Sequence, residues 1–347
     1  MAGRRGDGHR LIRWLWTSPR IDARLARAGL SPLAALWRAG VGARNLAFDR
    51  GWLDVHDLPL PAVAIGNLTV GGSGKTPLVG WIAGYYVTQG HKPGILLRGY
   101  GRDEVLVHEH NVPEAIVVAD PDRVAGAGRA LARGAEVLVL DDAFQRRDVF
   151  RDLNILLVSA EAARAVRYCL PAGPWREPAS AAARADVLIV TRKRADAATA
   201  AEVAREFGGM VSGPAGIIHL GVSRYAGMVS GRETPRASLD GKRVVAASAI
   251  ADPEAFIAQT KATGAQVQAA TWRDHHDFRD EDVAWLARAA RKADFVVLTE
   301  KDAVKLRDRW PASIPEPLVA ELSVEWEDGQ SEIVALLDGL VSQRGPL

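Results

Sequence analysis

The sequence predicts an α/β fold in which helices cover both faces of a mostly parallel β-sheet. From residue 61 onward, short runs rich in Val, Ile and Leu alternate with helical stretches, as parallel strands buried on both faces do. A glycine-rich loop, VGGSGKTPL at residues 70–78, follows the first of these runs, and two aspartates, Asp141 and Asp142, end a later one. Both features favour a sheet that binds a ligand at the carboxyl ends of its strands.

Length and composition favour two folded units preceded by a distinct N-terminal segment. The chain has 347 residues, of which 48% are hydrophobic and 25% charged, as in ordinary folded proteins. We expect an N-terminal segment at 1–50, the main α/β domain at 51–222 and a smaller α/β domain at 223–347. Residues 222–242, rich in Gly, Arg, Ser and Pro, are the expected boundary. The single cysteine, Cys169, permits no intramolecular disulfide and is expected to be buried.

The N-terminal segment differs from the rest in charge. Ten arginines and three aspartates give residues 1–50 a net charge of +7, so the remainder carries −5 of the overall +2. These arginines alternate with Trp14, Trp16, Trp37 and clusters of Leu and Ile. Such amphipathic helices suit the headgroup region of an anionic bilayer, or they pack on the protein itself. No run of about 18 apolar residues occurs, so no transmembrane helix is expected.

Each strand and helix of the two domains follows from its local pattern. The first domain is expected to have strands in PAVAIGN, KPGILLRG, AIVVAD, EVLVLDD, LNILLVS and DVLIVT. The second domain is expected to have strands in GIIHLGVS, RVVAASA, AQVQAA, DFVVLTE and PLVAELSV. KTPLVGWIAGYYVTQG is expected to be a helix, with Pro77 tolerated in its first turn. Further helices are expected near 252–263, 281–292 and 329–342.

The glycine-rich loop has the features of a phosphate-binding loop (P-loop). The pattern G-x-x-x-x-G-K-[ST] would place glycine at Thr69, but three glycines remain where the backbone must turn. Loop amides and a helix N-terminus attract phosphate oxygens, Lys75 adds a positive charge, and the Thr76 hydroxyl can bind Mg²⁺. We therefore expect a P-loop NTPase-type domain whose nucleotide contacts come from Thr69, Val70, Gly71, Gly72, Ser73, Gly74, Lys75 and Thr76.

The aspartate pair supplies the second part of a nucleotide site. Asp141 and Asp142 follow four apolar residues and so lie at the carboxyl end of a buried strand. A carboxylate there can hold Mg²⁺ directly or through water. With the glycine loop upstream, Asp141, Asp142 and Thr76 are the predicted metal ligands.

Motifs along most of the chain identify a family. IGNLTVGGSGKTP (65–77), LLRGYGRDE (96–104), DDAFQRRDVFRDLNILLV (141–158), LPAGPWREP (170–178), DHHDF (274–278) and LTEKDAVKL (298–306) occur in this order. Together they resemble the tetraacyldisaccharide 4′-kinases of lipid A biosynthesis, from about residue 35 nearly to the C-terminus. In that family the position of Thr69 is not glycine, which accounts for the unusual loop.

The resemblance implies an activity and a location. Such enzymes use ATP and Mg²⁺ to phosphorylate the 4′-hydroxyl of a lipid-linked glucosamine disaccharide 1-phosphate, which yields a 1,4′-bisphosphorylated lipid A precursor. They act at the cytoplasmic face of the bacterial inner membrane as peripheral proteins, held partly by an N-terminal helix. An anionic membrane surface is then the expected partner of residues 1–50, with no obligate protein partner.

The resemblance also implies catalytic residues in the second half of the site. The family's proposed general base is the Asp of a Gly-Asp-Glu-Pro motif, which is absent here, and the nearest candidate is Asp103, with Glu104 as the alternative. Asp274 and His275 match an Asp-His pair of the family, in which the histidine could orient Asp103 or contact phosphate. Lys75 would stabilise the transferred phosphate.

Other residues in the matched motifs have weaker assignments. Ala143 and Arg146 stand where the family usually has Gly and His, which affects the expected contacts around the metal. TEKDAVKL is interpreted mainly as a strand end, a capping Thr and a helix. Candidate contacts to nucleotide or acceptor are Arg98, Tyr100, Glu104, Arg123, Arg176 and Glu177.

Two alternative functions remain compatible with the P-loop. A kinase for a small soluble metabolite would give the Trp/Arg N-terminus no purpose. A membrane-associated ATPase switch would carry a Lys just before the paired glycines, where this chain has Val70. Nucleic-acid binding is not expected, because no recognition module occurs and residues 51–347 are acidic.

Overall fold

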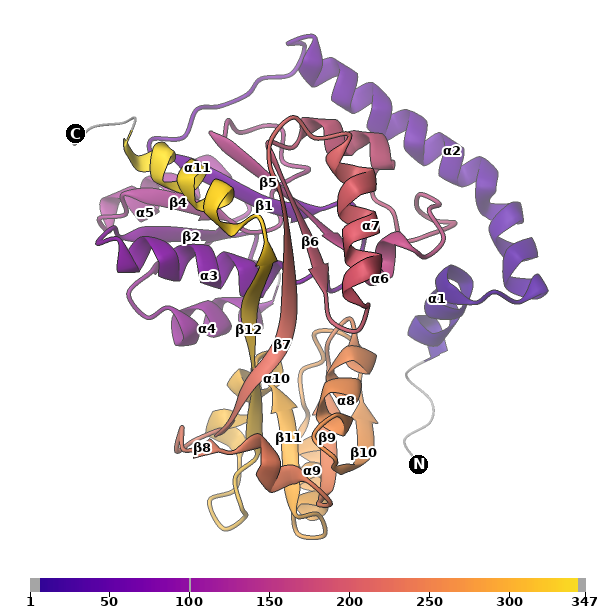
Figure 1. Cartoon of the computed structure of the whole chain (residues 1–347), viewed down its shortest axis with the longest axis vertical. Helices are drawn as coiled ribbons and strands as arrows, with labels where there is room; N and C mark the ends of the chain where they lie inside the picture. The colour runs from indigo at the N-terminus through magenta and orange to yellow at the C-terminus, as the bar shows by residue number, and fades with distance from the viewer. Residues whose placement is uncertain (1–6, 100, 343–347) are drawn as a thin grey trace. The chain divides into compact units, whose positions relative to one another are not determined.

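The computed structural model describes residues 7–99 and 101–342, without the side chains of residues 7–10 and 13. Its contacts divide the chain into two compact units (Figure 1). The first unit contains the described residues up to 99 together with residues 111–219 and 326–342. The second unit contains residues 101–110 and 220–325. Each unit is described by itself below.

The first unit is built on a fully parallel sheet. Its strand order is β7-β6-β5-β1-β4-β2-β3, and every printed pairing in it is parallel. The strands are β1 (Ala62–Asn67), β2 (Pro93–Leu97), β3 (Ile116–Ala119), β4 (Val137–Leu140), β5 (Leu153–Ser159), β6 (Val187–Arg192) and β7 (Ala215–Gly227). All residues of β1, β2 and β4 are buried, which confirms the expectation of strands covered on both faces.

Helices cover this sheet with small and branched apolar side chains. Cluster members Leu138 and Leu140 of β4 pack with Ala127 and Ala130 of α5, while Phe207 of α7 packs with strands β5 and β6. Helix α3 contacts β1, β2 and β4. The helices of this unit are α1 (Asp7–Thr17), α2 (Ile21–Asp49), α3 (Lys75–Thr88), α5 (Arg123–Ala132), α6 (Ala160–Ala163), α7 (Ala197–Gly208) and α11 (Gln330–Ser342), with a 3₁₀ turn at Ala179–Arg184.

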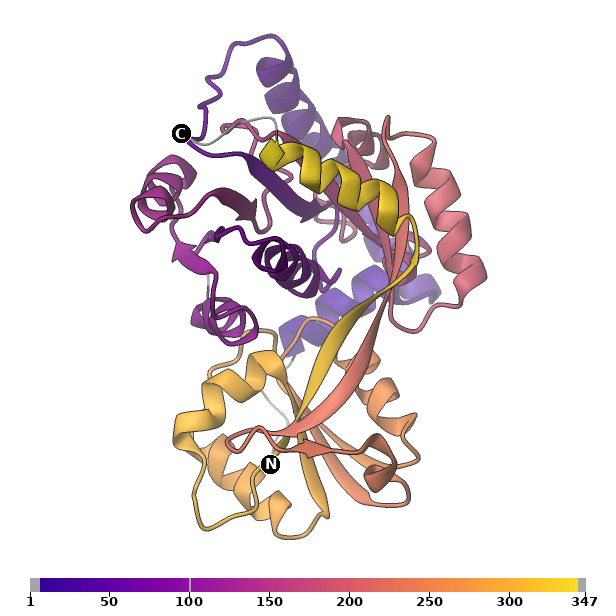
Figure 2. The same ribbon diagram turned by 60° about the vertical axis from the view of Figure 1, so that its left-hand side comes forward.

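The second unit has a smaller parallel sheet with the order β10-β9-β11-β12. Successive residues of its strands are buried in two different apolar clusters. One cluster contains Leu286 and Leu306, and the other contains Phe256. Its elements are α4 (Arg102–Asn111), β8 (Glu233–Thr234), β9 (Arg243–Ser248), α8 (Pro253–Lys261), β10 (Gln266–Thr271), α9 (Asp280–Ala290), β11 (Phe295–Thr299), α10 (Glu300–Leu306) and β12 (Leu318–Asp328), with 3₁₀ turns at Arg236–Leu239 and Arg307–Arg309. Apart from α4, which is purple, these strands and helices are the orange and gold ribbons in the lower part of Figure 2.

Several helices begin with a polar side chain that caps the first turn. Asp122, Asp196 and Asp252 each accept hydrogen bonds from backbone N–H groups in the first turn of α5, α7 and α8. Thr299 caps α10 by accepting from the N–H of Asp302, as interpreted for TEKDAVKL. Pro77 lies in the first turn of α3, and Cys169 is buried, both as expected.

The division into units differs from the expected boundary near residue 222 in two places. Residues 101–110 belong to the second unit, and the C-terminal helix α11 belongs to the first. Helix α11 returns because Ile333 and Leu337 are buried and the Tyr86 hydroxyl of α3 donates to the Leu337 carbonyl at 3.1 Å. The stretch 222–242 forms the β7–β8 hairpin and a 3₁₀ turn.

A close approach between β1 and the turn after β4 leads to the first prediction. A Cβ atom added at Gly66 would lie 2.6 Å from the Cβ and 2.7 Å from the N of Phe144. We expect Gly66→Ala to lower the free energy of unfolding by about 1–3 kcal/mol, because the turn must move to admit the methyl group. Urea unfolding monitored by circular dichroism measures this change.

The matched control is Gly84→Ala in α3, where an added Cβ meets nothing within 4 Å. Since Ala is favoured over Gly inside a helix, this variant should be neutral or more stable by about 0.5–1 kcal/mol. Equal stabilities of the two variants would contradict the close approach.

Candidate active site

The glycine loop joins β1 to α3 as predicted. Gly74 has φ +92° and forms the N-cap of α3, and Gly71 has φ +124°, both in the region that favours glycine. Lys75 and Thr76 are the first two residues of the helix. The loop therefore directs a helix N-terminus and its unpaired N–H groups to one point at the end of β1.

Two buried polar atoms at this loop fit a polar ligand. Ser73 is 3% exposed and Asn67 is 0% exposed. The Ser73 Oγ and Asn67 Nδ2 have no hydrogen-bond partner among the described residues. Buried polar atoms are normally satisfied, so these donors fit a site that receives phosphate oxygens.

Asp142 lies between two positive charges at the end of the adjacent strand β4. Its carboxylate is 3.3 Å from Lys75 Nζ, and both of its oxygens accept from Arg176 Nη1 at 3.0 Å. Burial alone would raise the pKa of Asp142, but the charges of Lys75 and Arg176 lower it below its usual value. Asp142 therefore stays ionised and is able to hold a cation.

The turn that carries Asp142 is tied to β1 by backbone contacts. The N–H of Ala143 donates to the Ile65 carbonyl at 3.0 Å, and Gln145 Nε2 donates to the Asn67 carbonyl at 2.8 Å. Asp141, the other predicted ligand, is 3% exposed. Among the described residues no group of three His, Cys, Asp or Glu side chains gathers to bind a metal. Mg²⁺ needs no such group when it is held by one or two carboxylates and by phosphates of the substrate.

The LPAGPWREP segment brings Arg176 to Asp142. Thr69 and Trp175 form an antiparallel bridge, the N–H of Val70 donates to the Pro174 carbonyl, and the N–H of Arg176 donates to the Leu68 carbonyl, both at 2.7 Å. Trp175 is buried. This segment therefore runs along the start of the glycine loop and fixes the arginine beside the carboxylate.

A loop after β6 supports the glycine loop from another side, and the sequence analysis missed it. The Thr191 hydroxyl donates to the Ser73 carbonyl at 2.9 Å, and Lys193 Nζ donates to the Gly72 carbonyl at 2.7 Å. Glu161 accepts from the N–H groups of Lys193, Arg194 and Ala195 at 2.7, 2.8 and 3.1 Å. No motif marks this loop, because its role depends on contacts between segments distant in the sequence.

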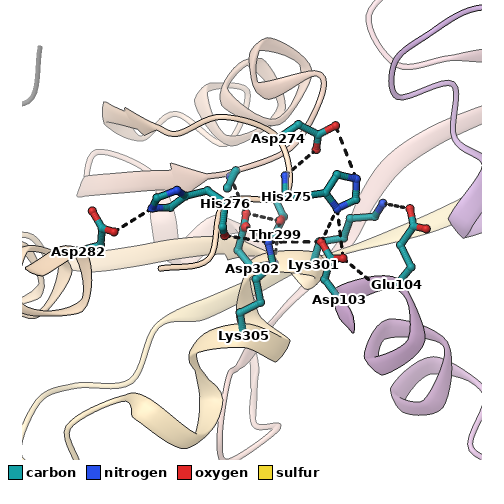
Figure 3. Close-up of polar contacts among 11 residues, drawn as sticks. Asp103, Glu104, Asp274, His275, His276, Asp282, Thr299, Lys301, Asp302 and Lys305 are labelled. Atoms are coloured by element: carbon teal, nitrogen blue, oxygen red, sulfur yellow. Dashed lines mark hydrogen bonds and ion pairs between the residues drawn. The ribbon is translucent and has the colours of Figure 1, made fainter. Parts of the chain in front are cut away.

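In the second unit, Asp103 and His275 form a hydrogen-bonded pair (Figure 3). Asp103 lies in the first turn of α4, is 4% exposed, and is 2.9 Å from His275 Nδ1. Burial would raise the pKa of Asp103, but His275, Lys305 and Lys301 lower it to about 2. The hydrogen bond that Asp103 accepts from His275 raises the pKa of His275. The structure thus brings together the two residues that the sequence proposed as base and partner.

Three neighbours of this pair complete the geometry. Asp274 Oδ2 lies 3.8 Å from His275 Nε2, and Glu104 pairs with Lys301 at 2.7 Å. A Cβ added at Gly101, which has φ +92°, would lie 2.6 Å from Asp103 Oδ1, so a side chain here would displace the carboxylate. Among the described residues, Asp142 and His275 are the non-glycine residues with positive φ, at 50° and 54°. Such conformations gather at functional sites.

The other candidate residues lie in different settings. Arg123 is 2% exposed and donates to the carbonyls of Asp120 and Asp141, which gives it a role in fixing backbone. Glu177 is buried against Arg184, and Arg98 is exposed after β2. Tyr100 lies outside the described residues. Ala143 and Arg146 stand where the family usually has Gly and His. Ala143 is buried, and Arg146 pairs with Asp148 at 2.8 Å.

The fold and this site define a P-loop nucleotide-binding protein. A glycine loop leads from a strand of a parallel sheet into a helix, and the Asp142 carboxylate, paired with Lys75 and Arg176, lies at the end of the neighbouring strand. Comparison with known proteins narrows this class. The family model described as tetraacyldisaccharide-1-P 4′-kinase matches residues 26–341. The chain belongs to the tetraacyldisaccharide 4′-kinase family.

Similar proteins support the same assignment. A tetraacyldisaccharide 4′-kinase of Geobacter metallireducens is 36% identical over 310 residues, which cover 82% of this chain and 89% of the relative. One of Xanthomonas campestris pv. campestris is 34% identical over 315 residues, covering 84% and 87%. The crystal structure of LpxK from Aquifex aeolicus in complex with ATP aligns with a TM-score of 0.71 at 27% identity, covering 91% of this chain and 99% of that one.

The Glu161 carboxylate leads to a prediction about pH. Burial would raise its pKa, but the three backbone N–H donors lower it from 4.5 to about 2. A lowered pKa stabilises the fold above the unfolded-state value, and this contribution is lost as the pH falls from about 4.5 toward 2. We expect Glu161→Gln to lower the free energy of unfolding at pH 7 by about 1.5–3 kcal/mol, the range for hydrogen bonds to a charged group.

Urea unfolding at a series of pH values measures this difference, which should narrow below about pH 4.5. The control is Glu202→Gln, because Glu202 forms an exposed pair with Arg164 and such pairs contribute little. A loss in Glu161→Gln that does not change with pH would show that the charge of this side chain is unimportant.

Proposed function

We propose that this protein transfers the γ-phosphate of ATP to the 4′-hydroxyl of a tetraacyldisaccharide 1-phosphate lipid. The observation that carries the proposal is the Asp142 carboxylate held between Lys75 and Arg176 at the mouth of the glycine loop, in a chain of this kinase family. Phosphoryl transfer depends mainly on positioning and on charge stabilisation, which this arrangement of groups supplies.

In the proposed mechanism the first unit binds the nucleotide. The N–H groups of residues 71–76 and the ammonium of Lys75 bind the phosphates. Arg176 adds a second positive charge that stabilises the phosphate oxygens on which negative charge develops in the transition state. Thr76, Asp141 and Asp142 would hold Mg²⁺, which neutralises phosphate charge when bound.

The second unit supplies the proton acceptor. Asp103 is ionised and takes the proton of the acceptor hydroxyl as the oxygen attacks phosphorus, and His275 orients the carboxylate through its Nδ1. A carboxylate of low pKa is ionised at neutral pH, so it can accept this proton while it also orients the hydroxyl.

Helix α2 exposes an apolar face, which suits an enzyme whose acceptor is a lipid. Ile21, Leu25 and Leu36 are 69%, 67% and 71% exposed, and at 3.6 residues per turn they lie within about 60° of one another. Ala23 and Ala34, on the opposite side, are buried. Arg24 is exposed and lies about 60° from Ile21, at the edge of the apolar stripe. This distribution suits a helix lying in the interface of an anionic bilayer, and we propose that α2 does so.

Helix α2 is not proposed to cross the bilayer. Among the described residues no helix combines the length and the apolar content that a membrane span requires. The location that we propose with this function is the cytoplasmic surface of the bacterial inner membrane, where the acyl chains of the acceptor remain in the lipid. The Trp16 and Trp37 indoles donate to the Pro171 and Arg176 carbonyls, so they hold the N-terminal helices on the first unit.

A direct assay tests the function. The purified protein, ATP, Mg²⁺ and the disaccharide 1-phosphate lipid in detergent micelles should give a bisphosphorylated lipid, detected by mass spectrometry. Lys75→Ala should abolish the product while the thermal melting curve stays near that of the wild type, because Lys75 stabilises charge on the phosphate. Absence of product from the wild-type protein would overturn the proposal.

The base assignment predicts a specific kinetic change. Asp103→Asn keeps the size of the side chain but cannot take the proton, so kcat should fall by about 10²- to 10⁴-fold with little change in KM for ATP. Glu104→Gln is the control, because Glu104 pairs with Lys301 and not with His275. Full activity in Asp103→Asn together with a loss in Glu104→Gln would transfer the role to Glu104.

The proposed membrane role predicts that vesicle binding can be weakened without loss of activity in detergent. Leu25→Glu combined with Leu36→Glu should weaken binding to vesicles containing phosphatidylglycerol by about tenfold or more, since burial of each leucine stabilises binding by about 1.5–3 kcal/mol. Cosedimentation measures this binding, and added salt should weaken it in the wild type. Activity in detergent micelles should remain.

The control for this experiment is Val229→Glu, since Val229 is 65% exposed in the second unit. Unchanged vesicle binding in the α2 variant would leave this helix as a scaffold of the first unit.

A further inference from the structure

Helix α10 carries a buried ion pair, Asp302–Lys305, beside the proposed base Asp103. Asp302 is 0% exposed, and the side chain of Lys305 is 11% exposed. The two charged groups are 3.5 Å apart and three residues apart on the helix. A buried ion pair is weak evidence for stability, because desolvation offsets much of its Coulombic attraction. Its contacts therefore need another explanation.

Lys305 connects this pair to Asp103 (Figure 3). Lys305 Nζ is 3.4 Å from Asp103 Oδ2 and donates to the His276 carbonyl at 3.3 Å. With Asp302 these contacts account for the three N–H directions of an ammonium group. The position of the charge is thus fixed beside the Asp103 carboxylate from the side of α10, while His275 approaches from its own loop.

Asp302 also holds the backbone that carries His275. Its Oδ2 accepts from the Thr299 hydroxyl at 2.6 Å and from the N–H of Ala249 at 2.9 Å. The carbonyl of the same Ala249 accepts from the N–H of His275 at 3.1 Å. One buried carboxylate therefore supports both partners of Asp103, one through an ion pair and the other through the backbone of residue 249.

Asp103 needs this support because it is nearly fully buried. A buried carboxylate without compensating charge takes up a proton, and a protonated Asp103 cannot accept one from an alcohol. The basic groups that face Asp103 are His275, Lys305 and Lys301, and only the first two contact it directly. Lys301, on the same helix, instead pairs with Glu104.

We propose that Lys305, held in place by Asp302, is a positioning residue that keeps the Asp103 carboxylate ionised and directed toward the acceptor hydroxyl. This inference rests on the proposed function, in which Asp103 is the base. It gives the motif TEKDAVKL a second role, because its Thr, Asp and second Lys form one chain of contacts that ends at Asp103.

The kinetic test removes the pair as a unit. Lys305→Met alone leaves Asp302 buried without a counter-charge, so the main variant is Asp302→Asn with Lys305→Met, which removes both charges and should fold. We expect kcat to fall by about 10- to 100-fold with KM for ATP within about threefold, because misplacing a catalytic group by about 1 Å has effects of this size. Lys305→Arg should recover part of the rate.

Lys261→Met is the control, because it makes the same substitution at an exposed lysine of helix α8 in the second unit. Its kcat should stay within about threefold of the wild type, since exposed substitutions away from a site have little effect. An active wild type with equal kcat values for the Lys261 variant and the double variant would overturn the inference and leave the proposed function intact.

A second readout needs no kinase activity. We expect the His275 pKa, measured by NMR titration of the full chain, to rise in the double variant, because Asp103 then shares its charge with His275 alone. The same double variant made in the Asp103→Asn background should leave the His275 pKa unchanged, since the effect passes through Asp103. Asp274, Asp103 and Lys301 also face His275. Each of these three positions is the same in the double variant and in the parent with which it is compared.

An equal shift in both backgrounds, or no shift in either, would overturn the inference. If the wild-type protein forms no bisphosphorylated lipid, the proposed function fails and the titration alone decides whether Lys305 acts on Asp103.

Discussion

The close approach of strand β1 to the turn after β4 is the constraint on which the nucleotide site depends. Gly66 leaves no side chain between the two segments, so the N–H of Ala143 reaches the Ile65 carbonyl and Gln145 reaches the Asn67 carbonyl. Parallel strands end at the same edge of the sheet, and this contact closes the remaining distance between the two ends. Asp142 consequently lies within 3.3 Å of Lys75, although the two residues belong to different crossover units of the sheet.

Both candidate carboxylates are kept ionised by the same physical means. Burial would raise the pKa of Asp142 and of Asp103, and in each case neighbouring basic groups reverse that effect. The basic groups in contact with Asp142 are Lys75 and Arg176, and those in contact with Asp103 are His275 and Lys305. A cation that can also bind phosphate suits the first position. Lys305, which is itself paired with the buried Asp302, suits the second position, where the carboxylate is proposed to accept a proton.

The sequence predicted the strands and the glycine loop well because both follow from local patterns. Fully buried parallel strands need continuous apolar runs, and a loop that wraps phosphate needs glycine. Asn67 could have been found by the signal that identified Asp141 and Asp142, since it also ends a buried strand. The pairs Arg176–Asp142 and Lys305–Asp103 could not, because each depends on segments 34 or more residues apart meeting in the fold. For the same reason no local signal assigned residues 101–110 to the second unit or α11 to the first.

Helix α2 packs on the first unit with some of its side chains and exposes an apolar stripe with others. The pattern of Arg, Trp and Leu predicts an amphipathic helix, but it does not tell which of these side chains face the protein. Trp37 donates to the Arg176 carbonyl and Arg44 to the Gln145 carbonyl, while Arg27 is buried and donates to the carbonyls of Leu15 and Ser18. These side chains tie α2 to α1 and to the two segments beside Asp142, and they leave Leu25 and Leu36 exposed. A single helix of 29 residues, about 40 Å long, thus bonds the segments that hold the nucleotide-site carboxylate and exposes the apolar stripe proposed to lie in lipid. Within the first unit, the orientation of that stripe is therefore set by the same hydrogen bonds that fix Arg176 and Gln145.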